Sequence, residues 1–215
     1  MLARLLTPRF AAAVLAMVVV VTASNILVQF PLRVSLGPVD LADILTWGAF
    51  TYPLAFLVSD LTNRHFGANT ARIVVVIGFA VAVVISAYLS APRIALASGM
   101  AFIVGQFLDI SVFQRLRNWL WYLPPLVGSL LGSAIDTLVF FSLAFAPAFM
   151  FVDMVFGMPD GSLPFPAPLL GVGPEVPLWL ALAAGDFCVK FLAAGVLLVP
   201  YRLLMGARAR RMAVA

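Results

Sequence analysis

Charged and chemically reactive side chains are scarce in this chain of 215 residues. Only 10% of the residues are charged, and the chain has one histidine, His65, and one cysteine, Cys188. A single cysteine excludes an internal disulfide and any multi-cysteine metal site. The HExxH and GxSxG motifs and a phosphate-binding glycine loop are absent, so neither a nucleophile with its base nor a metal site can be assembled. These absences argue against an enzyme. They also predict that the protein has no cofactor and no bound metal.

Long apolar runs dominate what is present. Hydrophobic residues make up 64% of the chain, and its mean hydropathy of +1.11 is far above that of soluble globular domains. A hydrocarbon core roughly 30 Å thick takes about 20 apolar residues per helix. The runs predict an all-α bundle of six transmembrane helices in a single domain, residues 1–215. Their approximate bounds are 10–30, 44–61, 73–91, 94–113, 125–145 and 178–200.

The first run has a second interpretation. Arg4 and Arg9 precede an apolar core, and Val21-Thr22-Ala23 resembles the cleavage site of a secretory signal peptide. The polar residues just after that point fit the end of a helix, which favours an uncleaved transmembrane helix.

The basic residues predict the orientation of the chain. Ten of the thirteen lie at the two termini and in the second and fourth connections, whereas the alternate connections hold only Arg33 and Arg93. The positive-inside rule then places both termini in the cytoplasm, as in a multi-pass protein of the inner membrane, and the charges do not indicate nucleic-acid binding. The fifth connection, residues 146–177, has seven prolines and no basic residue. We expect an extended outer segment there, either a passive linker or a lid.

A few ionisable and amide side chains lie inside the predicted helices, where such groups usually face a cavity or a partner. Asp136 stands deep in the fifth run and either contacts a substrate or joins helices as a hydrogen-bonded carboxyl. Asp186 and Lys190 are one turn apart in the sixth run, so they either bind a substrate or neutralise each other. Asn25 and Gln29 add hydrogen-bonding groups near the outer end of the first run.

Two further polar pairs lie at helical spacing. Gln106 and Asp109 share one face of the fourth run, and the alternative for Asp109 is a side chain that extends to the membrane interface. Asp60 and Arg64 are one turn apart at the end of the second run. They form either an ion pair that stabilises the helix end or a substrate contact.

Short segments in five of the six runs together form a recognisable pattern. They are 24–29 (SNILVQ), 46–50 (TWGAF), 60–62 (DLT), 66–67 (FG), 93–95 (RIA), 105–109 (GQFLD), 112–117 (VFQRLR), 136–138 (DTL), 140–141 (FF) and 186–190 (DFCVK). In their order and in their intramembrane polar residues, they resemble the queuosine precursor transporter family, also called the vitamin-uptake-transporter-like family. The resemblance does not cover the proline-rich fifth connection.

The resemblance implies import of two 7-deazaguanine bases, 7-cyano-7-deazaguanine and 7-aminomethyl-7-deazaguanine, into the cytoplasm. A guanine-like edge offers two adjacent N–H donors to a carboxylate and a carbonyl to an amide. Asp136, Asp109 or Asp186 could accept from the two donors. Asn25 or Gln106 could donate to the carbonyl, and aromatic side chains could stack on the ring.

Other functions remain open at this stage. Several branches of the family have an acidic residue where Arg64 stands, which leaves the substrate range and the energy coupling undecided. The alternative function is a small-molecule-binding subunit of an energised vitamin importer. Such a subunit could dock through Gly128 and Gly132, although close helix packing is their default role. A membrane enzyme, for example with an aspartyl dyad of Asp109 and Asp136, is the third reading, and a homo-oligomer is not excluded.

Overall fold

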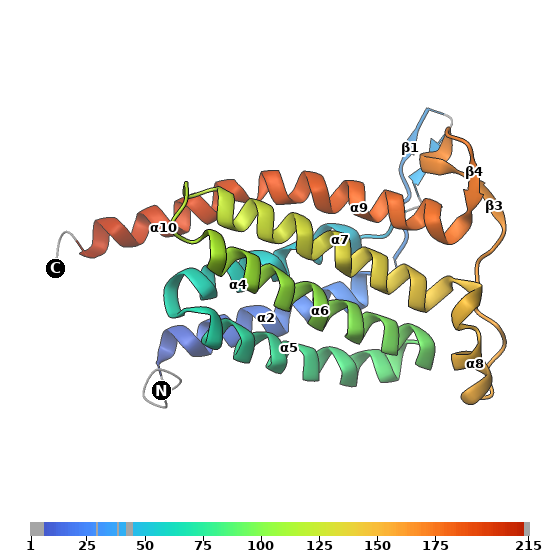
Figure 1. The fold of residues 1–215 in the computed structure, drawn as a ribbon, viewed down its shortest axis with the longest axis horizontal. Helices are drawn as coiled ribbons and strands as arrows, with labels where there is room; N and C mark the ends of the chain where they lie inside the picture. The colour runs from blue at the N-terminus through green and yellow to red at the C-terminus, as the bar shows by residue number, and fades with distance from the viewer. Residues whose placement is uncertain (1–6, 29, 38, 42–44, 213–215) are drawn as a thin grey trace.

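The computed structural model of the chain describes residues 7–28, 30–37, 39–41 and 45–212. Its long helices lie side by side along one axis, and two short β-ribbons stand beyond one end of the bundle (Figure 1). Helix α2 begins, and helix α10 ends, at the opposite end (Figure 1). Both ends of the described chain therefore lie at the same end of the bundle, as an even number of membrane crossings requires.

Within the described residues, five apolar helical stretches are long enough to cross a membrane. They are α2 (Pro8–Leu27), α5 (Ala68–Leu89), α6 (Pro92–Leu116), α7 (Leu123–Phe145) and the stretch Leu178–Met205, formed by α9 (Leu178–Val196) and the first part of α10 (Leu198–Met212). Proline stands in the first turn of α2, α6 and α7, where its missing N–H leaves no helical hydrogen bond unmade. The predicted all-α, multi-pass architecture is confirmed.

The second predicted run, 44–61, differs most from the prediction. Its first residue, Ile44, lies outside the described residues. The run is divided by Pro53 into α3 (Gly48–Thr51) and α4 (Pro53–Phe66), and α4 continues past Leu61 to a left-handed glycine, Gly67, with φ of 88°. The extra turn was missed because its residues are polar, although several of them are buried. A count of six membrane crossings, and the cytoplasmic side for the termini, stay predictions.

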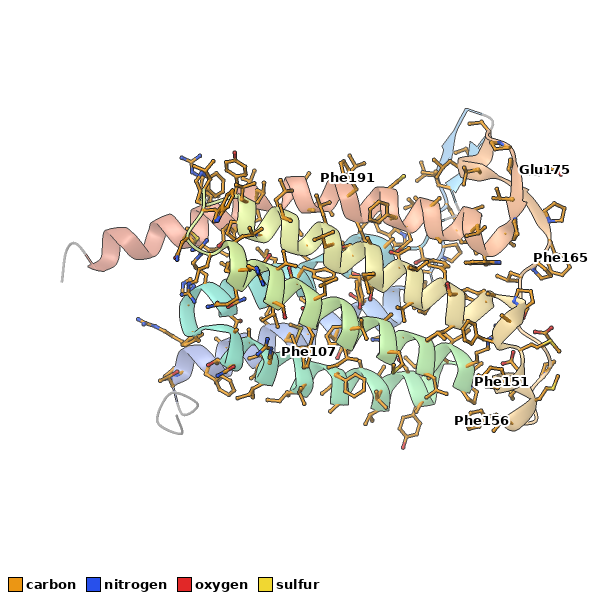
Figure 2. The ribbon with its side chains drawn as sticks, viewed as in Figure 1. Phe107, Phe151, Phe156, Phe165, Glu175 and Phe191 are labelled. Atoms are coloured by element: carbon orange, nitrogen blue, oxygen red, sulfur yellow. The ribbon has the colours of Figure 1, made fainter. Side chains whose placement is uncertain are left out.

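The bundle has an apolar outside and a partly polar inside. Large side chains such as Leu15, Val84 and Leu192 are more than half exposed, and Phe191 points away from α9 (Figure 2). Apolar side chains such as Met17, Val74, Phe102 and Ile110 fill the space between α2, α4, α5 and α6. Charged and amide side chains lie deep in the same interior. This distribution suits a hydrocarbon solvent and not water.

Helices α6 and α7 approach each other over glycines. A Cβ atom at Gly132 would lie 2.8 Å from the carbonyl oxygen of Gly105, and one at Gly105 would lie 2.9 Å from that of Gly132. The same stripe continues to Gly128, which faces Asp109. The small-residue face of α7 therefore packs against α6, as its default role predicted, and the close contact sets the spacing of the polar side chains on these two helices.

The fifth connection is folded and not simply extended. It contains η2 (Pro147–Phe149), α8 (Phe151–Val155), β3 (Pro166–Pro168), η3 (Leu169–Gly171) and β4 (Glu175–Pro177). β3 and β4 pair antiparallel, and a second ribbon is formed by β1 (Ser35–Leu36) and β2 (Val39–Asp40). Both ribbons lie at the end of the bundle away from α10 (Figure 1).

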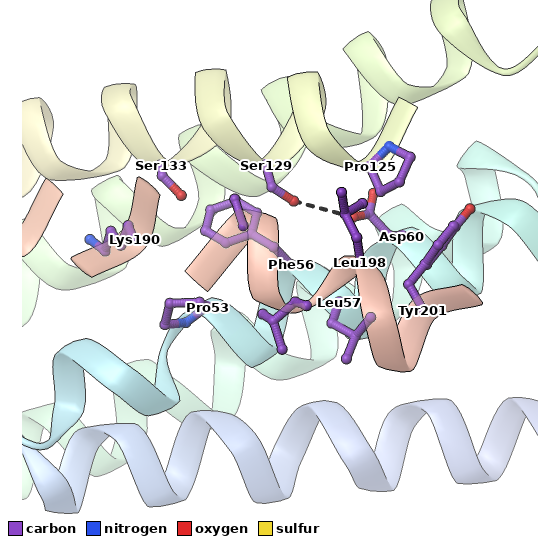
Figure 3. Close-up of a pocket in the computed structure, with 12 residues that line it drawn as sticks. Pro53, Phe56, Leu57, Asp60, Pro125, Ser129, Ser133, Lys190, Leu198 and Tyr201 are labelled. Atoms are coloured by element: carbon purple, nitrogen blue, oxygen red, sulfur yellow. Dashed lines mark hydrogen bonds between the residues drawn. The ribbon is translucent and has the colours of Figure 1, made fainter. Parts of the chain in front are cut away.

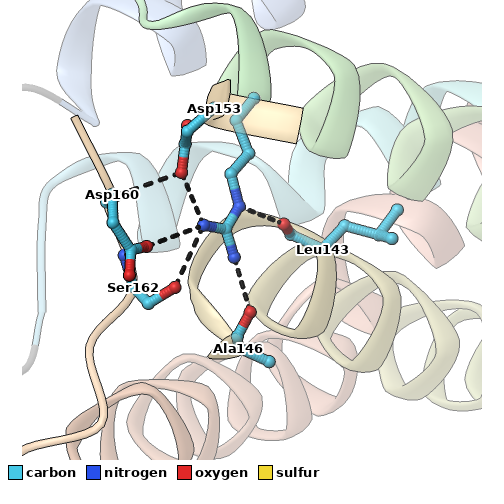
Figure 4. Close-up of polar contacts among 7 residues, drawn as sticks. Leu143, Ala146, Asp153, Asp160 and Ser162 are labelled. Carbon is cyan, nitrogen blue, oxygen red and sulfur yellow. Dashed lines mark hydrogen bonds and ion pairs between the residues drawn. The ribbon is translucent and has the colours of Figure 1, made fainter. Parts of the chain in front are cut away.

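Arg93 fastens this connection to the helices (Figure 4). Its guanidinium donates to the carbonyl oxygens of Leu143 and Ala146 and forms a 2.7 Å ion pair with Asp153, and Ser162 lies 3.1 Å away. The Arg93 side chain is buried, whereas the sequence suggested a loop residue. Nearby, hydrogen bonds from Ser162 lower the pKa of the exposed Asp160 carboxyl. A buried arginine with this many acceptors holds the connection in one place.

Candidate functional site

A cavity of about 490 Å³ lies in the half of the bundle nearer the ribbons. We call it the ribbon-side cavity. Its polar lining comes from Ser24, Asn25, Thr46, Ser86, Ser90, Ser98, Asp136, Asp186 and Lys190, and its aromatic lining from Tyr52, Phe140, Phe141 and Phe145. The volume is within the usual range of small-molecule sites, about 300–1,000 Å³. Few polar groups in a mainly apolar wall are also typical of such sites.

The charged groups in the lining form an ion-paired cluster, here called the carboxylate–lysine triad: Asp136, Asp186 and Lys190. The Lys190 ammonium lies 2.7 Å from Asp136 Oδ2 and 2.5 Å from Asp186 Oδ2. The side chains of Asp136 and Lys190 are nearly buried, and that of Asp186 is 16% exposed. The i,i+4 neutralisation of Asp186 by Lys190 was one of the two sequence-based readings, but the second carboxylate, from α7, was not expected.

Two hydroxyl groups complete the triad. The Tyr52 hydroxyl donates to Asp136 Oδ1 at 2.7 Å, and Lys190 Nζ also lies 5.0 Å from the Tyr52 ring centroid, within reach of a cation–π contact. The Thr137 hydroxyl donates to Asp186 Oδ2 at 2.7 Å and accepts from Lys190 at 3.1 Å. All three N–H groups of Lys190 thus have an acceptor. With every group ionised, the triad carries one net negative charge.

Asn25 joins the same cavity from α2. Its amide nitrogen donates to the Val21 carbonyl at 2.9 Å, and its Oδ1 accepts from the Ser86 hydroxyl at 2.8 Å. The structure therefore brings Asn25, Asp136, Asp186 and Lys190 together in the lining of one cavity, and their contact with a substrate stays a prediction. Gln29 lies outside the described residues. Ser86, like Tyr52 and Thr137, was missed, because a hydroxyl in a long helix carries no sequence signal of its own.

Gln106 and Asp109 do not line this cavity. Together with Asp60 they lie deeper in the bundle, fully or almost fully buried. Asp109 Oδ2 accepts from the Ser59 hydroxyl at 3.0 Å. Asp109 therefore does not extend to the membrane interface, which corrects that alternative. We call Asp60 and Asp109 the carboxylate pair.

The proposed Asp60–Arg64 ion pair is also wrong. In the described part of the chain, Asp60 accepts from the Ser129 hydroxyl at 3.2 Å and forms no ion pair. Arg64 instead donates to the Tyr201 hydroxyl at 3.1 Å and to the Arg117 carbonyl at 2.9 Å. Helical spacing permits an i,i+4 pair but does not require it, and tertiary acceptors direct this guanidinium elsewhere.

A second, very small pocket lies between the triad and the carboxylate pair. This α10-side pocket has a volume of about 10 Å³, and Lys190 lines it as well as the ribbon-side cavity. Figure 3 shows Lys190, Ser133, Ser129, Asp60 and Tyr201 in succession along the bundle. The hydroxyl groups of Ser133 and Ser129 therefore line the space between Lys190 and Asp60. Pro53 and Phe56 contribute its apolar wall.

The described residues contain no group of three or more His, Cys, Asp and Glu side chains that could hold a metal ion. What they do form is a helical bundle with an apolar outer surface, a cavity of small-molecule size and a buried ion-paired floor. These features define the class as a multi-pass membrane protein with a cavity of small-molecule size inside its bundle.

Comparison with known proteins narrows the class. A family model described as "Putative vitamin uptake transporter" matches residues 46–91 and 86–205. The chain is 33% identical over 216 residues to the "Queuosine precursor transporter" of Escherichia coli (strain K12), covering 90% of this chain and 85% of the relative. It is 35% identical over 191 residues to the "Probable queuosine precursor transporter" of Haemophilus influenzae, covering 71% and 81%. No solved structure matches.

The chain therefore belongs to the vitamin uptake transporter family. The family resemblance inferred from the short segments is confirmed, and so is the assignment as a transporter and not an enzyme.

Proposed function

We propose that this chain imports 7-deazaguanine precursors of queuosine, 7-cyano-7-deazaguanine and 7-aminomethyl-7-deazaguanine, across the inner membrane. Both relatives are named for queuosine precursors. The observation that carries the proposal is the floor of the ribbon-side cavity, where carboxylates, an ammonium and a tyrosine hydroxyl meet under a phenylalanine-lined wall. The ribbon end of the bundle is then the outer end, and the termini are cytoplasmic.

Asp136 is the group best suited to the guanine-like edge. Its two oxygens accept from Tyr52 and Lys190, and each oxygen retains a second lone pair for the two adjacent N–H donors of the base. Phe140 and Phe141, one turn along the same helix, supply aromatic faces for the flat ring. Asn25, across the cavity, has an amide that can reorient toward the base carbonyl, since its present acceptor is only a helix carbonyl.

Asp186 suits the substituent that distinguishes the two bases. It is the most exposed member of the triad, and among the described residues only its Oδ2 is engaged. Its Oδ1 can accept from a cationic aminomethyl group, and the net negative charge of the triad favours that cation. The nitrile of the other base is neutral and gains nothing from this charge.

The test is uptake of each labelled base by the purified protein in liposomes without any partner. We expect saturable uptake of both bases. Asp136→Asn should lower the affinity for both about ten- to a hundredfold, the effect of removing a bidentate contact to a base edge. Asp186→Asn should affect the aminomethyl base more than the cyano base. Glu175→Gln, which neutralises an exposed carboxylate, serves as the matched control.

Absence of uptake by the protein alone, with uptake restored by ATPase subunits, would favour a binding subunit of an energised importer. Wild-type affinity in the Asp136→Asn protein would assign Asp136 to helix association and not to the substrate.

A further inference from the structure

The carboxylate pair takes no part in the proposed contacts with the substrate. Asp60 and Asp109 are 2% and 0% exposed. Each has one oxygen that accepts from a serine hydroxyl, and the other oxygen, Oδ1, is buried without a hydrogen-bond partner in the described chain. Two aspartates are thus held in the interior by neutral donors alone.

The two carboxyl groups lie close together. Ser59, which donates to Asp109, is adjacent to Asp60, and Ser129, which donates to Asp60, is adjacent to Gly128. A Cβ atom at Gly128 would lie 2.5 Å from Asp109 Oδ1. Helix α7 therefore contacts both members of the pair, Asp60 through Ser129 and Asp109 through Gly128, so the two carboxyls share one part of the interior.

The surrounding helices bring few charges to the pair. On α4 the nearest is Arg64, which is bound to Tyr201 and Arg117. From α10 comes the Tyr201 hydroxyl, and α7 presents only serines and glycines here. From α9 comes Lys190, which is bound to the two carboxylates of the triad. Among the described residues, no cation lies within ion-pair distance of either Asp60 or Asp109.

Ionising two adjacent carboxylates without a cation costs a large electrostatic free energy in a region of low dielectric constant. Sharing a proton removes one charge and gives an unpartnered oxygen a donor, as in other carboxyl pairs. Gln106 provides independent support for a bound species at this place. It lies one turn before Asp109, is fully buried, and has both amide atoms unpartnered in the described structure. An amide can donate to a carboxylate or accept from a carboxylic acid.

We propose that Asp60 and Asp109, with Gln106 beside them, form a proton-binding site that couples uptake through the ribbon-side cavity to proton entry. This inference rests on the proposed function. In each cycle a carboxylate oxygen gains an O–H bond by taking a proton from water that enters from the outer side. The bond breaks when the proton passes to water on the cytoplasmic side, and no electrons change hands.

The fold connects this proton site to the substrate site. Asp136 of the triad and Ser129 of the proton site lie on the same face of α7, seven residues or about two turns apart. The α10-side pocket between them has room for about one water molecule. A displacement of α7 on substrate binding therefore moves a hydrogen-bond donor of Asp60 and the Gly128 contact with Asp109 at the same time.

The experiment separates coupling from transport itself. Wild-type protein, Asp60→Asn, Asp109→Asn and the control Glu175→Gln are placed in liposomes with the membrane potential clamped at zero. Labelled 7-cyano-7-deazaguanine, which is neutral, is followed first by counterflow without a gradient and then under an inward proton gradient of one pH unit. Entry of protons is followed in parallel with a trapped pH-sensitive dye.

We expect counterflow in all four proteins. Wild type and Glu175→Gln should accumulate the base up to about tenfold, the limit for one proton per substrate and one pH unit, and the lumen should acidify when substrate is added. Asp60→Asn and Asp109→Asn should retain counterflow within about twofold, but their accumulation should fall to equilibrium and acidification should cease. The asparagine keeps the shape of the carboxyl and cannot release a proton.

The following results would each overturn a proposal. Wild-type protein without counterflow would overturn the proposed function and this inference with it. Wild-type counterflow without a response to the proton gradient, or with a response to a sodium gradient instead, would overturn the inference alone. Full accumulation in both asparagine variants, or loss of their counterflow, would show that the pair is not the coupling site.

Discussion

The carboxylate–lysine triad and the carboxylate pair both place two aspartates inside the bundle, but only the triad contains a cation. In the triad, Lys190 contacts both Asp136 and Asp186 and faces a cavity large enough for a small molecule. In the pair, Asp60 and Asp109 accept hydrogen bonds, within the described chain, only from serine hydroxyl groups, and Asp60 lines a pocket of water size. A cluster that contains a cation can keep its carboxylates ionised as fixed charges for a ligand, whereas buried carboxylates without a cation favour binding of a proton.

The largest effect is expected when the cation of the triad is removed. Lys190→Met leaves the buried Asp136 and the partly exposed Asp186 without a cation, and we expect a loss of about 3–5 kcal/mol in the free energy of unfolding. The measurement is thermal unfolding of the purified protein in detergent.

The control is the triple variant in which Asp136→Asn and Asp186→Asn accompany Lys190→Met. It should recover most of the lost stability, because no unpaired charge remains. A single Lys190→Met protein as stable as wild type would mean that the carboxylates are not ionised together with the lysine.

A smaller effect is expected from crowding the pair. Gly128→Ala introduces a methyl group 2.5 Å from Asp109 Oδ1 and 3.1 Å from the Asp109 carbonyl oxygen, so the side chain or the helix must shift. We expect a loss of about 1–3 kcal/mol, typical of overpacking, in the same unfolding measurement.

Gly195→Ala on α9 is the matched control, since nothing lies within 4 Å of its Cβ position. Alanine should be neutral or stabilising there by up to about 1 kcal/mol. Equal behaviour of the two variants would argue against close contact between α7 and Asp109.

Removal of one hydrogen bond from the triad should have a milder effect. Tyr52→Phe deletes the donor to Asp136 Oδ1 and leaves the ring under Lys190. We expect a loss of about 1.5 kcal/mol in stability, the low end for a hydrogen bond to a charged group, together with a change in the affinity for substrate. Tyr88→Phe, at a tyrosine that is 87% exposed, should change neither quantity. An unaltered affinity in Tyr52→Phe would place the tyrosine outside the substrate contact.

The smallest effect is expected at the pair's longest hydrogen bond. Ser129→Ala removes a 3.2 Å contact to Asp60 and should cost about 0.5 kcal/mol, at the low end for a hydrogen bond. Ser111→Ala is the control, because this exposed hydroxyl donates to Phe107 of its own helix and accepts only a long, exposed contact of 3.4 Å from Arg72. A loss above that of Tyr52→Phe would contradict the neutral, proton-sharing character assigned to the pair.

Much of the architecture followed from the length of the apolar runs. Helices near the bilayer thickness need no tertiary information, because every backbone group must be bonded within the helix. The end of α4 was an exception: the apolar run predicted an end at Leu61, but the helix continues through a polar last turn to Phe66. The deep polar side chains were also identifiable, since ionisable residues are rare in such runs.

The partners of those side chains were predicted only in part. Asp186 and Lys190 do contact each other, as their spacing on one helix predicted. Asp60 and Arg64 have the same spacing and do not, because Tyr201 and the Arg117 carbonyl lie within reach of the guanidinium. Arg93 was expected in an outer loop, and the buried acceptors around it come from residues some 50 to 69 positions away.

The sequence by itself determined that this chain is a multi-pass helical protein, that several ionisable side chains lie within its apolar helices, and which family it belongs to. These properties depend on composition and on local order along the chain. Only the tertiary structure decided that Asp136 joins Lys190 while Asp109 joins Asp60, because the contact between α6 and α7 over glycines, and the position of α4 beside them, set which helix faces meet. That division into a triad with a cation and a pair without one is what separates the proposed substrate site from the proposed proton site.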